Sequence, residues 1–200
     1  MLISVCGTPG VGKTTVSSMF SDQGWKVISE KDLIRDMSLF DEMDTKNDEM
    51  IVDLEVVRNG FEKWAEDRTQ DTILDGHLSY LAPSDIIFIL RLDPQVLKER
   101  LSLRNYDQEK IDSNVGSEVI GYLLVKSVEE EQKVIDNNDA QWMGDGRKLV
   151  LERDITSLSK DEILGWMLEM IEAFRGKRLK TVSLYRPGKI DWLEAYSQWC

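Results

Sequence analysis

The sequence predicts an α/β fold in which helices cover both faces of a five-stranded parallel sheet, as a three-layer sandwich. Five short apolar segments alternate with segments of helical periodicity, which is typical of parallel β-α-β units. The chain has 200 residues, of which 42% are hydrophobic and 31% charged, as expected of one globular domain with a sizeable core. No apolar run reaches membrane-spanning length, so no membrane association is expected.

Charge and cysteine content narrow the class of protein. The net charge of −12 argues against general nucleic-acid binding. Only two cysteines are present, Cys6 and Cys200, so no disulfide framework is expected. An apolar strand is expected from residue 2, which leaves no room for a signal peptide. These features together predict a cytoplasmic protein.

The first expected strand, residues 2–6, leads into Gly-Thr-Pro-Gly-Val-Gly-Lys-Thr at residues 7–14, and a helix is expected over residues 14–23. Strand, glycine-rich loop and helix are the three parts of a phosphate-binding loop (P-loop). Glycines let backbone N–H groups converge on a polyphosphate, and the helix N-terminus adds partial positive charge. We therefore predict that a nucleoside triphosphate binds to Gly7, Pro9, Gly10, Val11, Gly12, Lys13, Thr14 and Thr15. Lys13 should reach the terminal phosphates, and the Thr14 hydroxyl should ligate Mg²⁺.

The segment after this helix is expected to contain one strand, two helices and a loop. Residues 25–29 predict a strand, and residues 31–38 a short helix that carries Arg35. Residues 41–48 are polar and acidic, so a mobile loop is expected there. Asp53 can cap a helix, because apolar residues follow it at helical spacing through residue 65. Arg35 could hold a phosphate of a second substrate or be an ordinary surface arginine.

Two further strands are expected at residues 72–75 and 85–92, and the first of them ends in a carboxylate. In P-loop proteins a carboxylate at the end of a neighbouring strand usually holds Mg²⁺ through water, so Asp75 is predicted to serve the metal. The alternative is a surface turn. His77, the only histidine, could orient or deprotonate a water or hydroxyl, or it could be structural.

Helix-start signals recur three times in the second half of the chain. They predict helices over about residues 93–104, 107–137 and 159–175, with weak points in the second at Gly116 and Gly121, and a last strand at residues 148–151. Arg100 and Arg104 lie four residues apart on one helix face. Paired arginines there could clamp a phosphoryl group or stack on a base, or they could be solvated surface residues.

Four motifs carry a resemblance to a known family. Residues 7–15 resemble the loop of nucleoside monophosphate kinases, and residues 75–78 resemble the Asp-x-His element of the atypical adenylate kinases of the isoenzyme six family. Residues 104–106 are similar to the Arg-Gly-Tyr stretch of that family, although asparagine replaces the glycine. Residues 32–35 resemble its monophosphate-binding segment. The resemblance covers about residues 1–175, and residues 37–50 match poorly.

The resemblance implies a kinase with a monophosphate-binding insert at about residues 30–68 and a short lid at about residues 104–116. It implies phosphoryl transfer between ATP and AMP with accompanying ATP hydrolysis, and Mg²⁺ as the cofactor. It also implies a role in maturation of the small ribosomal subunit, with a ribosomal protein and rRNA as partners; we expect a monomer. The rival hypotheses are a ribosome-assembly ATPase with incidental kinase activity and a kinase for another nucleotide.

The same resemblance assigns roles to single residues. Carried over, Lys13 and Thr14 hold ATP and Mg²⁺, Asp75 serves the metal, and His77 serves the hydrolytic water or the metal shell. The arginines divide between the substrates: Arg35 contacts AMP, Arg100 stacks on adenine, and Arg104 contacts phosphate.

A basic and aromatic tail, residues 176–200, is not explained by the kinase core. Six basic groups and no acid lie between residues 175 and 189, and aromatic residues continue to residue 199. A turn is expected at Pro187-Gly188, followed by a short helix over about residues 190–199. The tail either folds back on the acidic body, or contacts ribosomal RNA or a ribosomal partner.

Overall fold

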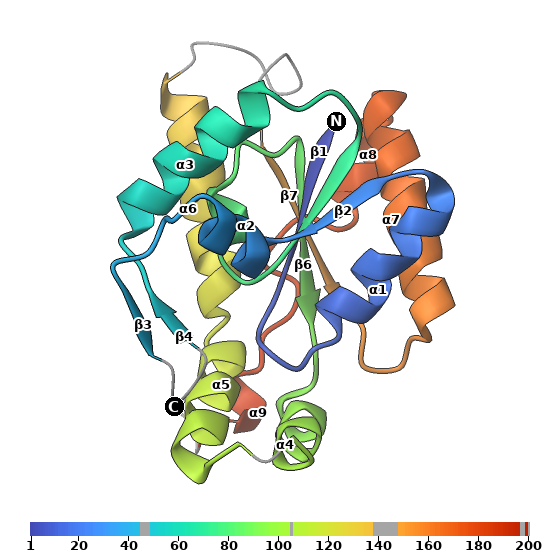
Figure 1. Ribbon diagram of the computed structural model, residues 1–200. Coiled ribbons are helices and arrows are strands. Elements are labelled where there is room, and N and C mark those ends of the chain that lie inside the picture. Colours follow the sequence, from blue (N-terminus) through green and yellow to red (C-terminus); the bar gives the residue numbers. More distant parts are fainter. Residues whose placement is uncertain (45–48, 105, 138–147, 197–198, 200) are drawn as a thin grey trace.

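The protein is built on a five-stranded parallel sheet with helices on both faces, as the sequence predicts (Figure 1). This computed structural model describes residues 1–44, 49–104, 106–137, 148–196 and 199. The strands are hydrogen-bonded in the order β2-β5-β1-β6-β7 and are all parallel. They comprise β1 (Leu2–Cys6), β2 (Lys26–Ser29), β5 (Thr72–Asp75), β6 (Ile86–Arg91) and β7 (Leu149–Asp154).

The central strand β1 explains why the apolar segments are continuous and do not alternate. Every residue of β1 and β6 is buried. Ile3 and Val5 face one core, whereas Leu2 and Cys6 face another on the opposite side of the sheet. A parallel strand that is covered on both faces needs apolar side chains at successive positions.

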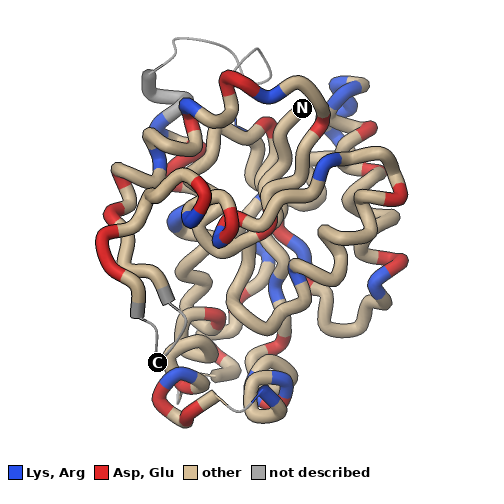
Figure 2. Tube along the Cα trace, in the orientation of Figure 1, with Lys and Arg blue, Asp and Glu red and all other residues tan. Residues whose placement is uncertain are grey.

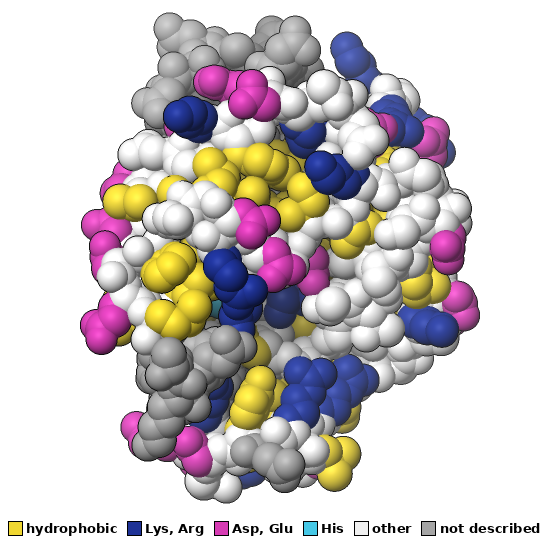
Figure 3. Space-filling model, in the orientation of Figure 1, with side chains coloured by type: hydrophobic (Ala, Val, Ile, Leu, Met, Phe, Trp, Pro, Cys, Tyr) yellow, Lys and Arg dark blue, Asp and Glu magenta, His cyan; other side chains and the backbone are white. Residues whose placement is uncertain are grey.

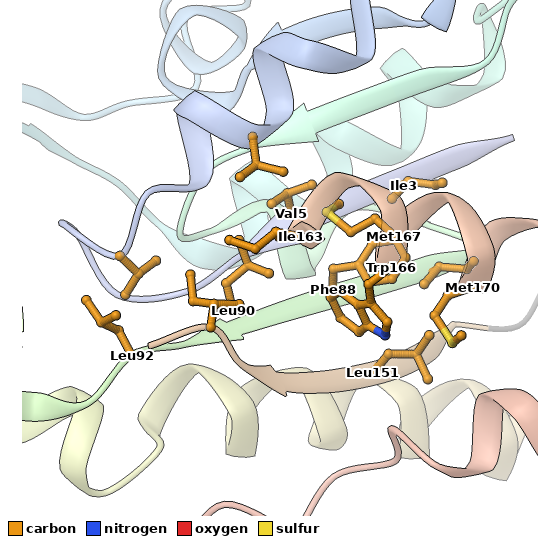
Figure 4. Packing of buried hydrophobic residues seen from close by; sticks show 14 of the residues in the cluster. Ile3, Val5, Phe88, Leu90, Leu92, Leu151, Ile163, Trp166, Met167 and Met170 are labelled. Carbon is orange, nitrogen blue, oxygen red and sulfur yellow. The ribbon is translucent and has the colours of Figure 1, made fainter. Parts of the chain in front are cut away.

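The first core lies between the sheet and two helices, α1 (Lys13–Met19) and α7 (Lys160–Arg175). A short 3₁₀ turn, Phe20–Gln23, extends α1 and ends at Gly24 with φ of 80°, as expected of a C-terminal glycine. The rings of Phe88 on β6 and Trp166 on α7 pack edge to face, with centroids 5.0 Å apart (Figure 4). The predicted capping box of Ser159 is present at the start of α7.

The second core lies on the opposite face, under three other helices. They are α2 (Glu30–Asp36), α3 (Leu54–Glu66) and α6 (Tyr122–Asn137). Asp53 caps α3 as predicted, because its side chain accepts from the N–H groups of Glu55 and Val56. Helices on both faces of one sheet confirm the expected three-layer architecture.

The loop expected at residues 41–48 is partly a β-hairpin, and that prediction is wrong. Strands β3 (Glu42–Asp44) and β4 (Glu49–Ile51) pair antiparallel, while residues 45–48 lie outside the described residues. Met43 pairs with Met50, and Met50 packs against the second core. These apolar side chains within an acidic stretch give the hairpin a face to bury, which an account based on charge alone misses.

Two helices, α4 (Pro94–Ser102) and α5 (Gln108–Val119), lie together beyond the carboxyl ends of the strands (Figure 1). The helix expected over residues 107–137 is divided into α5 and α6 at Gly121, one of its two predicted weak points, which has φ of 65°. A Cβ atom there would also lie 3.3 Å from Nη1 of Arg91. The glycine therefore turns the chain where a larger residue would be strained. Asn105, named in the sequence motif between these helices, lies outside the described residues.

The tail folds back on the body through α8 (Leu179–Ser183) and α9 (Leu193–Tyr196). Val182 is fully buried, and both Nη atoms of Arg186 donate to Glu131 of α6. The Tyr196 hydroxyl donates to Asp93 at 2.7 Å. The helix expected over residues 190–199 is shorter, and Cys200 lies outside the described residues. Figure 2 shows basic residues near α8 and acidic residues on the outer helices and loops. Across the described ranges, no helix is long and apolar enough to cross a membrane.

Candidate active site

The P-loop joins the end of β1 to the start of α1, as the sequence predicts. Gly7, Gly10 and Gly12 have φ values of 151°, 100° and 111°. A Cβ atom on Gly7 would lie 2.6 Å from the carbonyl oxygen of Leu90, so the loop passes too close to β6 for any side chain there. Within the loop Val11 is buried in the first core, whereas Thr14 and Thr15 are exposed at the start of α1.

Lys13 curls back over the loop that precedes it. Its Nζ donates to the carbonyl oxygens of Gly7 at 2.7 Å and Thr8 at 3.2 Å. Burial lowers the pKa of Lys13, and the nearby acids Asp75, Glu30 and Glu118 oppose that shift. A lysine held over P-loop backbone in this way is placed to meet the phosphates of a bound nucleotide.

Asp75 lies beside the P-loop because β5 pairs with β1. It is the register partner of Val5, and the N–H of Gly76 donates to the Val5 carbonyl at 3.2 Å. Asp75 is buried, and its Oδ1 has no hydrogen-bond partner in the described part of the chain. Burial raises the pKa of Asp75, while the Thr14 hydroxyl and Lys13 nearby favour the charged form.

These residues fit a magnesium ion better than a metal held by protein alone. The described residues contain no group of three or more His, Cys, Asp or Glu side chains that could enclose a metal. Mg²⁺ is commonly held by one or two protein oxygens together with substrate phosphates and waters. The unsatisfied Asp75 Oδ1 and the neighbouring Thr14 hydroxyl are oxygen donors of this kind.

His77 is paired with a buried acid that the sequence motifs do not reveal. Its Nδ1 lies 3.0 Å from Oε1 of Glu30, the first residue of α2. Oε2 of the same carboxylate accepts from the Leu78 N–H at 2.6 Å. Glu30 is 4% exposed. Glutamate in the first turn of a helix is ordinarily explained by the helix dipole, so no sequence pattern places Glu30 in the site.

Of the three predicted arginines, one contacts the P-loop. Nη1 of Arg100 on α4 donates to the Val11 carbonyl at 3.1 Å. Arg104, just beyond the end of α4, is exposed, and its side chain makes no hydrogen bond to the described residues. Arg35 is also exposed and lies 3.3 Å from Asp32 on the same helix. The P-loop and Arg100 are thus together, and Arg35 and Arg104 are not held there.

A buried ion network fastens the P-loop to α5 and the sheet. The Thr8 hydroxyl donates to Oε2 of Glu118 at 2.5 Å, and Nε of Arg91 donates to Oε1 of Glu118 at 2.7 Å. Nη1 of Arg91 donates in turn to Glu152 on β7 at 2.7 Å. Burial raises the pKa of Glu118, and Arg91 opposes the shift. Figure 3 shows Lys and Arg side chains on both sides of the hollow between the main body and the part formed by α4 and α5.

Comparison with known proteins agrees with this architecture. Residues 3–121 match the family model described as an AAA domain. A protein from Thermococcus gammatolerans named "Putative adenylate kinase" is 33% identical over 199 residues, which cover 99% of this chain and 96% of that protein. One of the same name from Methanosarcina mazei is 32% identical over 211 residues, covering 98% of this chain and 99% of that protein.

Solved structures bear on the fold alone. The structure of a sugar kinase from Janibacter superposes with a TM-score of 0.51 at 13% identity, covering 86% of this chain and 94% of that one. Full-length identity above 30% and a family match over more than half of the chain are together decisive. The chain therefore belongs to the family of P-loop proteins that carry this AAA domain and include the two proteins named "Putative adenylate kinase".

Proposed function

We propose that the protein is an ATP:AMP phosphotransferase, an adenylate kinase, with accompanying ATPase activity. The observation that carries the proposal is the buried Asp75 carboxylate, whose Oδ1 is unsatisfied, beside Thr14 and Lys13 at the P-loop. A carboxylate oxygen that is buried without a partner costs stability, which a nucleotide-bound metal would offset. The names of the two relatives support the choice of ATP and AMP as substrates.

The ATP half of the site consists of groups that position and neutralise charge. P-loop N–H groups surround the phosphates, and Lys13 leaves its contact with the Gly7 carbonyl to meet them. Thr14 and Asp75 would hold Mg²⁺, which would supply charge neutralisation for the transferring phosphoryl group. Arg100, fixed to the Val11 carbonyl, stands where it can stack on a base or contact phosphate. Transfer is then in line, with no covalent intermediate on the enzyme.

The AMP contact is proposed from Arg35 on α2, and a phosphate contact from Arg104 beyond α4. Both side chains are exposed in this structure, and both residues follow the P-loop in the chain. They fit the roles of ligand contacts that form when substrates bind and the segment at residues 104–116 closes as a lid. The insert at about residues 30–68 comprises α2, the β3–β4 hairpin and α3.

A coupled assay with ATP, Mg²⁺ and a panel of nucleoside monophosphates tests the proposal. We expect AMP to be the best acceptor, and Lys13→Met to remove transfer and hydrolysis together, because Lys13 is the lysine of the P-loop. Glu55→Gln, an exposed change on α3, is the control and should retain activity. Faster turnover with another monophosphate would overturn AMP specificity, and activity of Lys13→Met within about threefold of wild type would overturn the P-loop mechanism.

The second candidate is an ATPase that acts in maturation of the small ribosomal subunit, with a ribosomal protein and rRNA as partners. His77 favours this candidate, because an imidazole two residues beyond Asp75 can accept a proton from a water that attacks ATP. The partners rest on the family resemblance alone, since Arg186 and Tyr196 of the tail contact the body. ATP hydrolysis that rises on addition of a small-subunit ribosomal protein would favour this candidate. Unchanged hydrolysis would count against it.

A further inference from the structure

We propose that Glu30 is a positioning residue that fixes His77 with its proton on Nδ1, so that Nε2 is free to accept a proton from the water that attacks ATP. The inference rests on the proposed function and deepens it, because it assigns a residue to the ATPase reaction at the same site. It does not depend on which monophosphate is the acceptor.

The geometry of the Glu30 carboxylate carries the proposal. Each of its two oxygens has one partner. Oε1 lies 3.0 Å from Nδ1 of His77, and Oε2 accepts a hydrogen bond from the Leu78 N–H at 2.6 Å. An ionised carboxylate only accepts hydrogen bonds, so Nδ1 must carry a proton to bond to it. The opposite ring nitrogen, Nε2, is then the basic one in the neutral ring.

The local structure is built around this carboxylate. Glu30 is 4% exposed, although its His77 partner is largely exposed. A Cβ atom on Gly76 would lie 2.1 Å from Cδ of Glu30, so the chain between Asp75 and His77 has space for this carboxylate only because that residue is glycine. The carboxylate of Glu30 is bonded to the histidine and to the chain beside it.

The surroundings place this pair at the reacting end of the nucleotide site. Glu30 acts electrostatically on both Lys13 and Asp75. His77 is two residues beyond Asp75, and the Cys6 thiol, next to the P-loop, donates to the His77 carbonyl at 3.3 Å. Charged groups from the P-loop, the end of β5 and the start of α2 thus meet here. A hydrogen-bonded carboxylate commonly sets the tautomer and orientation of a functional histidine.

The hydrolysis step involves ATP, one water molecule and the imidazole of His77. The oxygen of water forms a bond to the γ-phosphorus as the bond from that phosphorus to the β-γ bridging oxygen breaks. ADP leaves with the electron pair of the broken bond, one proton of the water passes to Nε2 of His77, and the other stays on the released phosphate. The Glu30 carboxylate faces the resulting imidazolium at Nδ1 and stabilises it.

The Glu30→Gln variant distinguishes two roles of Glu30: positioning of the His77 ring, and only joining α2 to the loop after β5. Glutamine is isosteric but has one acceptor oxygen and one NH₂ group. Because the Leu78 N–H always donates, the amide oxygen should face it and the NH₂ group should face Nδ1. The proton of the neutral ring would then move to Nε2, which removes the free base while α2 stays joined to the loop.

The experiment is ¹⁵N NMR of the imidazole at about pH 8.5, where an ordinary histidine is neutral. His77 is the only histidine in the chain, so its signals need no assignment. We expect the Nδ1-protonated form in the wild type and in Asp36→Asn, an exposed charge-removing control on α2. Glu30→Gln should shift to the Nε2-protonated form. An Nε2-protonated wild type, or the same tautomer in wild type and Glu30→Gln, would overturn the inference.

Kinetics give the second readout. ATP hydrolysis by Glu30→Gln should fall by about 10–100-fold in kcat, with transfer to AMP and the KM for ATP changed much less. Equal losses of hydrolysis and transfer would indicate that Glu30 only joins α2 to the loop and does not position His77. If Glu30→Gln does not fold, Glu30→Asp tests the same point, because its shorter side chain withdraws the acceptor from Nδ1. If the wild type hydrolyses no ATP, the proposed ATPase activity fails, whereas the NMR result still decides whether Glu30 sets the tautomer.

Discussion

The buried surroundings of Asp75 disfavour the ionised form of its carboxyl group. Burial raises its pKa, so its ionised form is less favourable in the folded chain than in the unfolded one. The stabilising contribution of such a group is present below the unfolded pKa and is lost as pH rises through the folded pKa. At neutral pH, without nucleotide, the ionised side chain therefore lowers the stability of the fold.

Asp75→Asn should consequently raise the melting temperature at neutral pH while it lowers activity. We expect Mg²⁺-dependent turnover to fall by about 10–100-fold, as for the loss of a metal-supporting residue. Thermal melts with and without Mg²⁺-ATP give the check: the extra stability that the nucleotide supplies should shrink in the variant. A variant that melts lower than wild type and binds Mg²⁺-ATP equally well would mean that Asp75 is structural.

Cys6 provides a pH-dependent test of the strand beneath the P-loop. Burial raises the pKa of the Cys6 thiol from 9.0 to about 12, so the folded chain keeps a proton that the unfolded chain loses. Its contribution to stability is complete below pH 9.0 and declines as pH rises toward about 12.

The stability difference between wild type and Cys6→Ala should therefore narrow above pH 9.0. The slope has an upper limit of about 1.4 kcal/mol per pH unit, set by one proton. Denaturant titrations between about pH 8 and 10.5 measure it. A difference that stays constant across this range would show that the thiol titrates alike in both states.

Sequence patterns predict those residues of the candidate site that belong to local motifs. Lys13 and Thr14 follow from the P-loop, and Asp75 and His77 from a strand end beside it. Glu30 and Glu118 were not foreseen, because their partners are distant in sequence: Leu78 is 48 residues from Glu30, and Thr8 is 110 residues from Glu118. A helical glutamate is ordinarily solvated, and only the packed fold reveals that these two are buried.

At the scale of elements, one carboxylate at the start of α4 both caps this helix and joins it to the tail. Asp93 caps the helix by accepting from the N–H groups of Gln95 and Val96, and its other oxygen accepts from the Tyr196 hydroxyl. The same acid therefore joins the helix that carries Arg100 to the tail.

Asp93→Ala should destabilise the protein by about 1 kcal/mol or more, since a lost N-cap alone costs that amount. Tyr196→Phe, which keeps the cap and the ring, should cost less. Denaturant midpoints of the two variants decide the point. Equal losses of stability in the two variants would mean that Asp93 contributes through its hydrogen bond to Tyr196 and not through the helix cap.

Elements were predicted best where local signals agree with packing. The starts of α3, α4 and α7 followed from their caps, and all five strands of the sheet from apolar runs. The β3–β4 hairpin was not predicted, because its two methionines stand among acidic residues, and an acidic stretch is typical of a loop. The division between α5 and α6 falls at Gly121, one of the two glycines that the sequence marks as weak points, and its φ is positive.

At the scale of the whole molecule, the basic tail is part of the body. Both Nη atoms of Arg186 donate to buried Glu131, and the Gly188 N–H donates to Oε2 of Glu152 at 3.0 Å. The aromatic end reaches α4, where Nζ of Lys98 lies 4.9 Å from the centroid of the Trp199 ring. Arg186 is thus paired within the molecule, whereas Lys177, Arg178 and Lys180 are exposed.

Truncation after Gly176 should therefore lower the stability sharply, because it exposes the pocket of Val182 and leaves Glu131 without its arginine. Loss of a partner from a buried ion pair alone costs about 3–5 kcal/mol. A melting curve of the truncated chain beside Arg186→Ala provides the measurement, with RNA affinity at two salt concentrations as the second readout. An unchanged melting temperature with weaker, less salt-dependent RNA binding would instead assign the tail to recruitment.

The position of β1 has a consequence for the order in which the molecule can be assembled during synthesis. β1 and the P-loop are made early, but β1 pairs with strands that begin at residues 72 and 86, and Thr8 bonds to Glu118. Domains generally fold as units, and pairings between distant segments form slowly. Nascent chains that end before residue 118 thus contain the whole nucleotide-binding motif but lack the Glu118 carboxylate that holds Thr8, so nucleotide affinity should rise only after that residue has been made.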